Sequence, residues 1–443
     1  MSASYAILRQ VNEVVEKPYM DEIFHVPQAQ QYCMGRFGTW DPKLTTPPGL
    51  YLVSLVPRLA APWIACTTAY LRLTNWVLGM ALFWTVYGIL RTLRPHLSAA
   101  ATAIATVAVS LTPVVFFFHH MYYTDTGSLL FVLLAYLASL RANHMAAAVL
   151  GFISLWFRQT NAIWVIFIGG SAVLKWIQQT SVMCGPNDSL WHSITQMAQW
   201  MVRPDGSGRD GRWNVVRVLM PYACVGALFA VFVGVNGGIV LGDKTHHQAV
   251  LHVPQMLYFY AYAAGMLSPI VVMVASPLWW FVQTTRSVRG IAQLACACAA
   301  MGICVKRYTM EHAFLLSDNR HYPFYVWKNV YRRHWAAKYA IVPLYAYAMA
   351  AVHQCIGGGA LWRMALVGCT AAVLVPSPLL EFRYFTIPLI LARLHMTADT
   401  FRIPAVAMEA LWYCAINAGT VWLFLNRPFA WDSEPGQQQR FMW

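Results

Sequence analysis

The chain has 443 residues, of which 58% are hydrophobic, 14% aromatic and only 11% charged, with a mean hydropathy of +0.48. This usage lies outside that of ordinary soluble domains and predicts an integral membrane protein. The formal net charge of +14 is distributed between apolar runs rather than on one basic face. That pattern argues against a nucleic-acid partner and favours membrane lipids and phosphates.

The chain opens with a polar segment, 1–17, followed by a second polar segment that contains two adjacent acids. Residues 1–17 are too polar for a signal-peptide core or a spanning helix. We expect 18–72 to form an acidic loop and an interfacial helix, held rigid by Pro47 and Pro48. Asp21 and Glu22 point in different directions on any regular backbone, so at most one of them faces a given reacting atom. A solvated start of a loop is the alternative interpretation.

The rest of the chain is dominated by apolar runs. A helix needs roughly 20 mostly apolar residues to cross a bilayer, and lipid excludes unpaired backbone groups, so unalternating runs predict helices rather than a barrel. The predicted fold class is all-α, a polytopic membrane protein with about twelve transmembrane helices. The runs are 73–90, 98–118, 128–140, 145–156, 162–177, 218–235, 256–282, 291–305, 339–356, 361–375, 385–394 and 408–425.

These runs and the segments between them suggest a division of the chain. We expect a transmembrane bundle over 73–177, a basic loop over 178–217, a second bundle with long loops over 218–425 and a C-terminal tail over 426–443. Because 178–217 carries Arg203, Arg209, Arg212 and Arg217, the positive-inside tendency makes it cytosolic. The glycosylation sequon at Asn187 lies in this loop, so we expect it to stay unmodified.

Counting crossings from the basic loop places 18–48, 119–126, 236–255, 306–338 and 381–384 together on the opposite face. Four cations also fall there, against the charge rule: Lys306, Arg307, Arg332 and Arg333. An anionic ligand on that face would explain them.

The ten cysteines lie mostly inside apolar runs and show neither metal-ligand spacing nor a secreted disulfide framework. We interpret them as packing residues. His246, His247 and His252 lie beside Asp243, but adjacent histidines diverge and the spacing fits no strong zinc pattern. We therefore assign no metal.

Several motifs together resemble one family. They are DEIFHVPQAQ from Asp21, WDPKLTTPPGLY from Trp40, RQTN from Arg158, NGGIVLGDK from Asn236, LLSDNRHY from Leu315, EFRYF from Glu381 and the terminal QRFMW. They resemble the eukaryotic dolichyl-phosphate-glucose-dependent alpha-1,2-glucosyltransferases, which add the last glucose to the lipid-linked oligosaccharide used for asparagine-linked glycosylation. The resemblance runs from Tyr19 to Trp443.

The resemblance implies a C-type (GT-C) glycosyltransferase of the endoplasmic reticulum membrane, with its active site in the first lumenal loop. It implies a dolichyl phosphate glucose donor, a dolichyl-pyrophosphate-linked oligosaccharide acceptor, no cofactor and inversion at the transferred sugar. One carboxylate base then suffices, because the phosphate leaves as a stable anion. Asp21 is the first candidate for the base and Glu22 the second, while Asp41 is a candidate to bind sugar hydroxyls.

Further residues of these motifs are candidates for substrate binding. His25 and Gln28 follow the two acids. Arg320 and Arg383 are candidates to hold the leaving phosphate, because a guanidinium binds two phosphate oxygens at once. Asp318 and His321 complete a polar set suited to sugar and phosphate recognition; pairing of Asp318 with Arg320, and of Glu381 with Arg383, is the structural alternative.

Two questions stay open at the level of sequence. Members of the resembled family carry a spanning helix before the acidic segment, and 1–17 cannot supply one. Arg158, Gln159 and Asn161 interrupt an apolar stretch and fit contacts within a bundle as well as catalysis. The alternative functions are a polytopic lipid or solute transporter, a related enzyme that mannosylates proteins, and a non-catalytic channel regulator.

Overall fold

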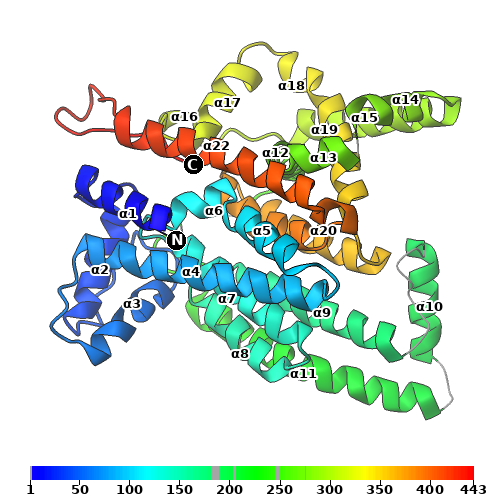
Figure 1. The fold of residues 1–443 in the computed structure, drawn as a ribbon, viewed down its shortest axis with the longest axis horizontal. Coiled ribbons are helices and arrows are strands. Elements are labelled where there is room, and N and C mark those ends of the chain that lie inside the picture. Colours follow the sequence, from blue (N-terminus) through cyan, green and yellow to red (C-terminus); the bar gives the residue numbers. More distant parts are fainter. Residues whose placement is uncertain (1, 181–188, 203–205, 245–248, 275) are drawn as a thin grey trace. The chain divides into compact units, whose positions relative to one another are not determined.

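The computed structural model describes residues 2–180, 189–202, 206–244, 249–274 and 276–443 (Figure 1). These residues form helices joined by loops, and extended backbone pairs only at three isolated bridges among them. The chain divides into two compact units. Unit 1 comprises Met1–Leu97, Phe118–His247 and Gly358–Cys369, and unit 2 comprises Ser98–Phe117, Gln248–Gly357 and Thr370–Trp443.

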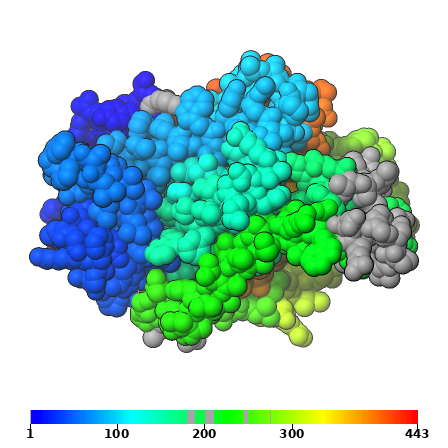
Figure 2. All heavy atoms as spheres, turned by 90° about the horizontal axis from the view of Figure 1, so that it is seen from below, coloured from blue at the N-terminus to red at the C-terminus, as the bar shows by residue number. Residues whose placement is uncertain are grey.

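Unit 1 is a bundle in which α7 packs against both α4 and α8, and α11 packs against α8 and α9. The short helix α3 contacts α4, α7 and α8, so the polar segment after α2 is attached to the bundle. In Figure 2 the blue atoms of the first 60 residues adjoin the teal atoms of the region around residue 140. Its helices are α1 (Ser2–Val14), α2 (Glu22–Cys33), α3 (Gly49–Ala60), α4 (Thr68–Leu93), α7 (Thr124–Leu140), α8 (His144–Leu155), α9 (Asn161–Thr180), α10 (Leu190–Val202) and α11 (Gly206–Asn236).

Unit 2 is built around α22, which packs against α5 and α13, and around α19, which packs against α12, α13 and α15. Its elements are α5 (Ala99–Ser110), α12 (Gln255–Met266), α13 (Ser268–Val274), α14 (Pro277–Thr285), α15 (Val288–Tyr308), α16 (Ala313–Ser317), α17 (Tyr322–Val326), the π-helix η1 (Trp327–Tyr331), α18 (Ala337–Ala340), α19 (Val342–Cys355), the 3-10 helix η2 (Phe382–Phe385), α21 (Thr386–Leu394), the 3-10 helix η3 (Ala398–Phe401) and α22 (Ile403–Asn426). Two helices have residues in both units, α6 (Pro113–Phe118) and α20 (Ala360–Leu374).

The helices are consistent with a polytopic membrane protein. Among the described residues, four helices are long and apolar enough to cross a bilayer, and a fifth crossing arises if α12 and α13, bent by 87°, count as one. The four cover Thr68–Leu93, Asn161–Gln179, Gly211–Asn236 and Val288–Tyr308. All twelve predicted runs are largely helical, but several of these helices are too short to pass the same criterion.

Prolines break three of the predicted runs. The run 98–118 divides before Pro113, 256–282 divides before Pro269 and Pro277, and 339–356 divides before Pro343. Proline lacks the N–H that continues an α-helix and disfavours helical backbone at the residue before it. The sequence pattern therefore predicts where apolar helix occurs better than it predicts where one helix ends.

Polar side chains cap the N-termini of several helices. The side chains of Thr67, Ser98 and Asn143 accept hydrogen bonds from the backbone N–H groups of Tyr70, Ala101 and Ala146, at 3.2, 3.1 and 3.1 Å. Such a cap satisfies one of the N–H groups that have no partner in the first turn.

Two polar segments contain more helix than their composition suggests. The N-terminal stretch forms α1, which buries Leu8 and Val11 and packs against α4. The stretch 178–217, expected as a polar connection, contains α10 and the beginning of α11. Asn187, Arg203, His246 and His247 lie outside the described residues.

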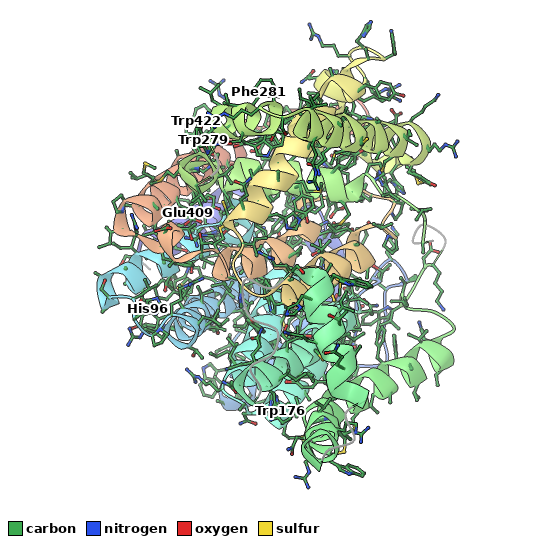
Figure 3. All side chains as sticks on the ribbon, turned by 90° about the vertical axis from the view of Figure 1, so that its right-hand side faces the viewer. His96, Trp176, Trp279, Phe281, Glu409 and Trp422 are labelled. Atoms are coloured by element: carbon green, nitrogen blue, oxygen red, sulfur yellow. A yellow bond between two sulfur atoms is a disulfide. The ribbon has the colours of Figure 1, made fainter. Side chains whose placement is uncertain are left out.

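Large apolar side chains remain exposed on long and short helices alike, as a lipid-facing surface requires. Trp279 and Phe281 of α14 and Trp422 of α22, labelled in Figure 3, are each at least half exposed. Glu409, labelled in the same view, is fully buried and forms a bidentate pair with Arg393, with N–O distances of 2.8 Å. A buried ion pair thus braces α21 against α22.

Candidate functional site

Asp21 stands at the start of α2, directly after a strained residue. Met20 has a φ of +56°, in the left-handed region that costs a non-glycine residue about 1–2 kcal/mol. The backbone N–H of Asp21 donates to the hydroxyl of buried Tyr123 at 3.1 Å, and the Asp21 side chain is half-buried. The fold thus fixes the backbone that carries this carboxylate, next to a strained residue.

Glu22 points into the protein and is completely buried. Its carboxylate receives Nε and Nη2 of Arg72 at 2.9 and 2.6 Å, the backbone N–H of Tyr19 at 3.0 Å and that of Tyr122 at 2.7 Å. Arg72 is equally buried and also donates to the Asn12 side chain and to the backbone carbonyls of residues 15 and 17. The Glu22–Arg72 pair therefore joins the N-terminal segment, α2, α4 and the loop before α7.

His25 and Gln28 lie on the buried face of α2 and attach it to the segments around it. His25 Nδ1 is 2.7 Å from the hydroxyl of Tyr51 on α3. Gln28 donates to the Thr39 carbonyl at 2.7 Å and accepts the backbone N–H of Asp41 at 3.0 Å. Gln28 thereby holds the backbone of Asp41 in place. The side chain of Asp41 accepts a hydrogen bond from the backbone N–H of Lys43 at 2.9 Å.

The loop that carries Asp41 is held from several sides. Gln159 Nε2 donates to the carbonyl of Thr45 at 2.7 Å, and the backbone N–H of Asp243 donates to the carbonyl of Pro42 at 2.8 Å. Gly242 has a φ of +63°, and a Cβ there would lie 2.3 Å from the Pro42 oxygen. Only glycine lets the backbone at position 242 come this close to Pro42. The NGGIVLGDK motif therefore holds the 41–45 loop in place.

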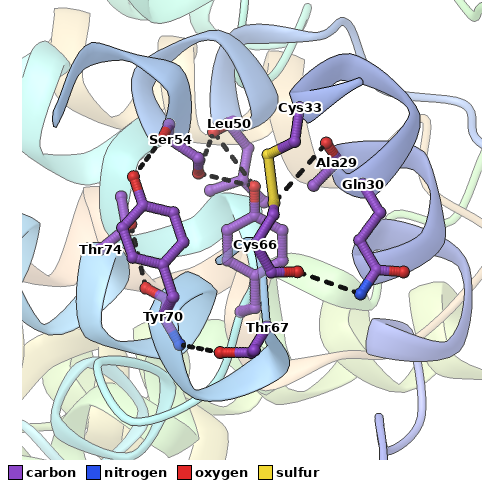
Figure 4. Close-up of a disulfide and its surroundings, with 10 residues drawn as sticks. Ala29, Gln30, Cys33, Leu50, Ser54, Cys66, Thr67, Tyr70 and Thr74 are labelled. Atoms are coloured by element: carbon purple, nitrogen blue, oxygen red, sulfur yellow. Dashed lines mark hydrogen bonds between the residues drawn. A yellow bond between two sulfur atoms is a disulfide. The ribbon is translucent and has the colours of Figure 1, made fainter. Parts of the chain in front are cut away.

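A disulfide joins Cys33, at the end of α2, to Cys66, in the loop that precedes α4 (Figure 4). Gln30 reinforces the connection by donating to the Cys66 carbonyl at 3.1 Å. The interpretation of the cysteines as packing residues is wrong for this pair. Thirty-three residues separate the two positions, and only the fold reveals that they meet.

The second polar set lies in unit 2 and is assembled around Arg320. Its guanidinium binds Asp318 with two N–O distances of 2.8 and 2.7 Å, donates to Gln439 at 3.0 Å and stacks 4.6 Å from the Trp431 ring centre. His321 Nδ1 is 2.8 Å from the carbonyl oxygen of Trp443. The Asp318–Arg320 pair, named above as the structural alternative, is present, and the QRFMW motif packs directly on DNRHY.

The charge state of Asp318 follows from these contacts. Burial alone would raise the pKa of Asp318, but the hydrogen bonds from Arg320 and the charges of His321 and Arg320 outweigh it and lower the pKa below its ordinary value. This carboxylate is therefore ionised at neutral pH.

Arg383 pairs with Glu381, as the structural alternative anticipates, at N–O distances of 2.9 and 2.6 Å. The neighbouring Phe382 ring lies 6.0 Å from that of Trp443, whose carbonyl contacts His321. Unit 2 therefore brings Arg383 and the Asp318–His321 set into one aromatic neighbourhood.

The predicted site residues fall into two groups. Asp21, Glu22, His25, Gln28 and Asp41 come together in unit 1, on α2 and the loop after it. The remaining four come together in unit 2: Asp318, Arg320, His321 and Arg383.

Sequence reasoning missed Arg72 and underestimated Gln159. A single cation at the edge of an apolar run is the signal that identifies Arg72, because such a charge requires a buried partner. Within the RQTN motif the roles differ: Arg158 pairs with Asp125 at 2.9 Å, and Asn161 bonds to Ser128 inside the bundle. Gln159 reaches the loop of Asp41.

Comparison with known proteins shows near full-length relatives. The Dol-P-Glc:Glc(2)Man(9)GlcNAc(2)-PP-Dol alpha-1,2-glucosyltransferase of Rattus norvegicus is 36% identical, covering 98% of this chain and 94% of the relative. Proteins with the same name from Homo sapiens and Arabidopsis thaliana are 35% and 34% identical, over 98% of this chain and 94% and 96% of theirs. No solved structure matches. The DIE2/ALG10 family model matches residues 15–394, so the chain belongs to the DIE2/ALG10 family.

Proposed function

We propose that this chain is a glucosyltransferase that moves glucose from dolichyl phosphate glucose to the diglucosylated dolichyl-pyrophosphate oligosaccharide, forming the terminal alpha-1,2 linkage of the N-glycan precursor. The near full-length match to relatives that carry this activity in their names supports the proposal. The same comparison disfavours a transporter or a channel regulator, because all the predicted site residues lie within the matched region.

Asp21 is the general base in this proposal, and Glu22 is a positioning residue. Glu22 is fully buried and its oxygens already accept four hydrogen bonds, so it cannot receive a proton from a bulky acceptor without losing Arg72. Asp21 is half-buried, and a strained turn and the Tyr123 hydroxyl fix its backbone. The geometry of Asp21 is typical of a group held in place for chemistry.

The reaction is a single displacement. The acceptor 2-hydroxyl oxygen attacks the anomeric carbon of the donor glucose while its proton passes to Asp21. The bond between that carbon and the phosphate oxygen breaks, and dolichyl phosphate leaves with the electron pair. Attack opposite the leaving group converts a beta donor linkage into an alpha product linkage.

The binding roles of the remaining residues follow from their contacts. Gln28 and Gln159 hold the loop of Asp41, which is assigned to sugar hydroxyls. His25 braces α2 against α3 next to the same loop. Arg320 and Arg383 are assigned to phosphate oxygens, where their ion pairs with carboxylates keep the guanidinium planes oriented.

We place the active site on the lumenal face of the endoplasmic reticulum, in a GT-C architecture of about twelve spans. The Cys33–Cys66 disulfide supports this orientation, because disulfides persist in oxidising compartments and are rare in the cytosol. The disulfide lies in the same segment as Asp21, so this support extends to the acidic loop.

The test is glucose transfer by purified protein, in nanodiscs, from synthetic donor to diglucosylated acceptor. Asp21→Asn should reduce turnover by at least about 100-fold, as loss of a general base does. The matched control is Asp399→Asn, an exposed aspartate paired only with exposed Arg402, which should leave turnover unchanged. Full activity of Asp21→Asn would refute the base assignment, and no transfer by the unmodified chain would refute the function.

A further inference from the structure

Unit 2 carries an exposed basic surface that the catalytic assignment does not use. It extends from the end of α15 through η1 to α18 and contains Lys306, Arg307, Lys328, Arg332, Arg333 and Lys338. Five of the six are exposed and Lys338 is half-exposed. We call this set the basic cap.

The basic cap is a continuous region because its elements pack together. Helix α18 contacts both α15 and η1. Trp327 of η1 donates to Glu311, just beyond α15, at 3.1 Å. Within η1 the Trp327 ring stacks on that of Tyr331, with 4.5 Å between the ring centres, so the contact with Glu311 also fixes the end of η1.

Charge on this region is strongly unbalanced. Residues 306–338 contain seven Lys and Arg against Glu311 and Asp318. Asp318 is committed to Arg320 through two short hydrogen bonds. Within the part of the chain that the structure describes, no ion pair involves a member of the basic cap; Lys328 and Lys338 instead lie over aromatic rings, at 5.7 and 5.4 Å from the ring centres.

The length of α15 indicates that the basic cap lies at the level of the lipid headgroups. Helix α15 is a candidate span of 21 residues, about 31 Å long, which matches the hydrocarbon thickness. Its last turn, with Lys306 and Arg307, therefore reaches the headgroup level. Exposed Trp335 and Phe314, at 75% and 52% exposure, accompany the cations, and this mixture is typical of a surface at the membrane interface.

We propose that the basic cap captures the pyrophosphate group of the lipid-linked acceptor, an inference that rests on the proposed function. A pyrophosphate diester carries two negative charges at one headgroup position, and six cations around one exposed carboxylate form a complementary field. The donor phosphodiester carries one charge and matches this field less well. Nitrogen-tipped side chains stand out from the yellow segment at the top of Figure 3, as capture from the membrane plane requires.

The experiment compares Arg332→Gln/Arg333→Gln with Arg286→Gln/Arg289→Gln. The control pair is exposed, flanks the other end of the same helix and removes the same charge. At about fivefold per cation near a surface, the first variant should raise the acceptor KM on the order of 20-fold, with kcat and donor KM unchanged. The control should match the unmodified chain.

Binding of a fluorescent short-chain polyprenyl pyrophosphate, measured in zwitterionic nanodiscs, provides a readout without turnover. It should weaken by the same factor in Arg332→Gln/Arg333→Gln and fall with added salt. If binding and acceptor KM are unchanged, if donor KM rises instead, or if phosphatidylglycerol nanodiscs compete as strongly as the pyrophosphate, the proposal is wrong. Because binding is measured separately, failure of the basic cap is distinguishable from failure of the glucosyltransferase assignment.

Discussion

Replacement of Glu22 by glutamine tests how the fold holds Asp21. The four hydrogen bonds to the Glu22 carboxylate come from Arg72, Tyr19 and Tyr122, and both charged side chains have zero exposure. An amide retains one acceptor oxygen, but its NH₂ group then faces two donors, either from Arg72 and Tyr19 or from Arg72 and Tyr122. The Arg72 charge also loses its buried counterion.

Breaking one partner of a buried ion pair costs about 3–5 kcal/mol, because an uncompensated charge remains inside the protein. That is a large part of the 5–15 kcal/mol typical of a native fold. We therefore expect Glu22→Gln to lower the midpoint of thermal unfolding by about 5–10 °C. Turnover should fall with it, since displacement of reacting groups by about 1 Å can cost 100-fold.

The double variant Arg72→Met/Glu22→Gln separates stability from positioning. Removing both charges eliminates the uncompensated cation, so most of the unfolding free energy should return. The two hydrogen bonds between Arg72 and Glu22, which hold the residue next to Asp21, remain absent in the double variant. We therefore expect kcat to stay about 100-fold below that of the unmodified chain while the substrate KM changes little. Thermal unfolding and single-turnover glucose transfer on the same preparation measure the two effects.

The Arg393–Glu409 pair is a matched control, because it is bidentate and buried as well. Glu409→Gln should destabilise unit 2 to a similar extent, with kcat per folded molecule unchanged. If the double variant Arg72→Met/Glu22→Gln turns over at the normal rate, the Glu22–Arg72 pair is purely structural and the positioning argument fails.

Three further predictions test other parts of the structure. Cys33→Ser/Cys66→Ser should lower the free energy of unfolding by about 4 kcal/mol, from the closure entropy of a 33-residue separation. The electrophoretic mobility of this variant should be the same with and without reductant. Gly242→Ala should place a Cβ 2.3 Å from a carbonyl oxygen of the 41–45 loop and reduce glucose transfer, whereas alanine at Gly368, which has open space around it, should not. The pKa of Asp318 in the folded protein is lowered from 3.8, so its contribution to stability is complete above pH 3.8 and is lost as the pH falls through the folded pKa. In Asp318→Asn, the free energy of unfolding should therefore no longer fall with pH in this acidic range. If that pH dependence is retained, the pairing with Arg320 is contradicted.

Sequence reasoning succeeded where a local pattern determines the outcome. Apolar runs predicted the helices, and the paired residues of the DNRHY and EFRYF motifs are close enough in sequence to find each other. The buried pair of Glu22 with Arg72 spans 50 positions, and the clamp of Gly242 on Pro42 spans 200. Contacts of this kind depend on how helices pack, which local periodicity does not encode.

The two acids illustrate the same limit. Adjacent carboxylates look equivalent in sequence, and their opposite environments arise only when α4 delivers Arg72 to one of them. The strain at Met20 is equally invisible, because methionine carries no signal for left-handed backbone. Family resemblance identified the motif, and geometry distinguished the two residues in it.

The disulfide also has a consequence for how the molecule is made. Both sulfur atoms belong to the first 66 residues of a 443-residue chain. At a synthesis rate of about 5–20 residues per second, roughly 20 s or more of translation remains after Cys66 is incorporated. The covalent ring of residues 33–66, which contains Asp41, can therefore close while most helices do not yet exist. The loop of Asp41 is then organised first, and the helices that follow are assembled onto it.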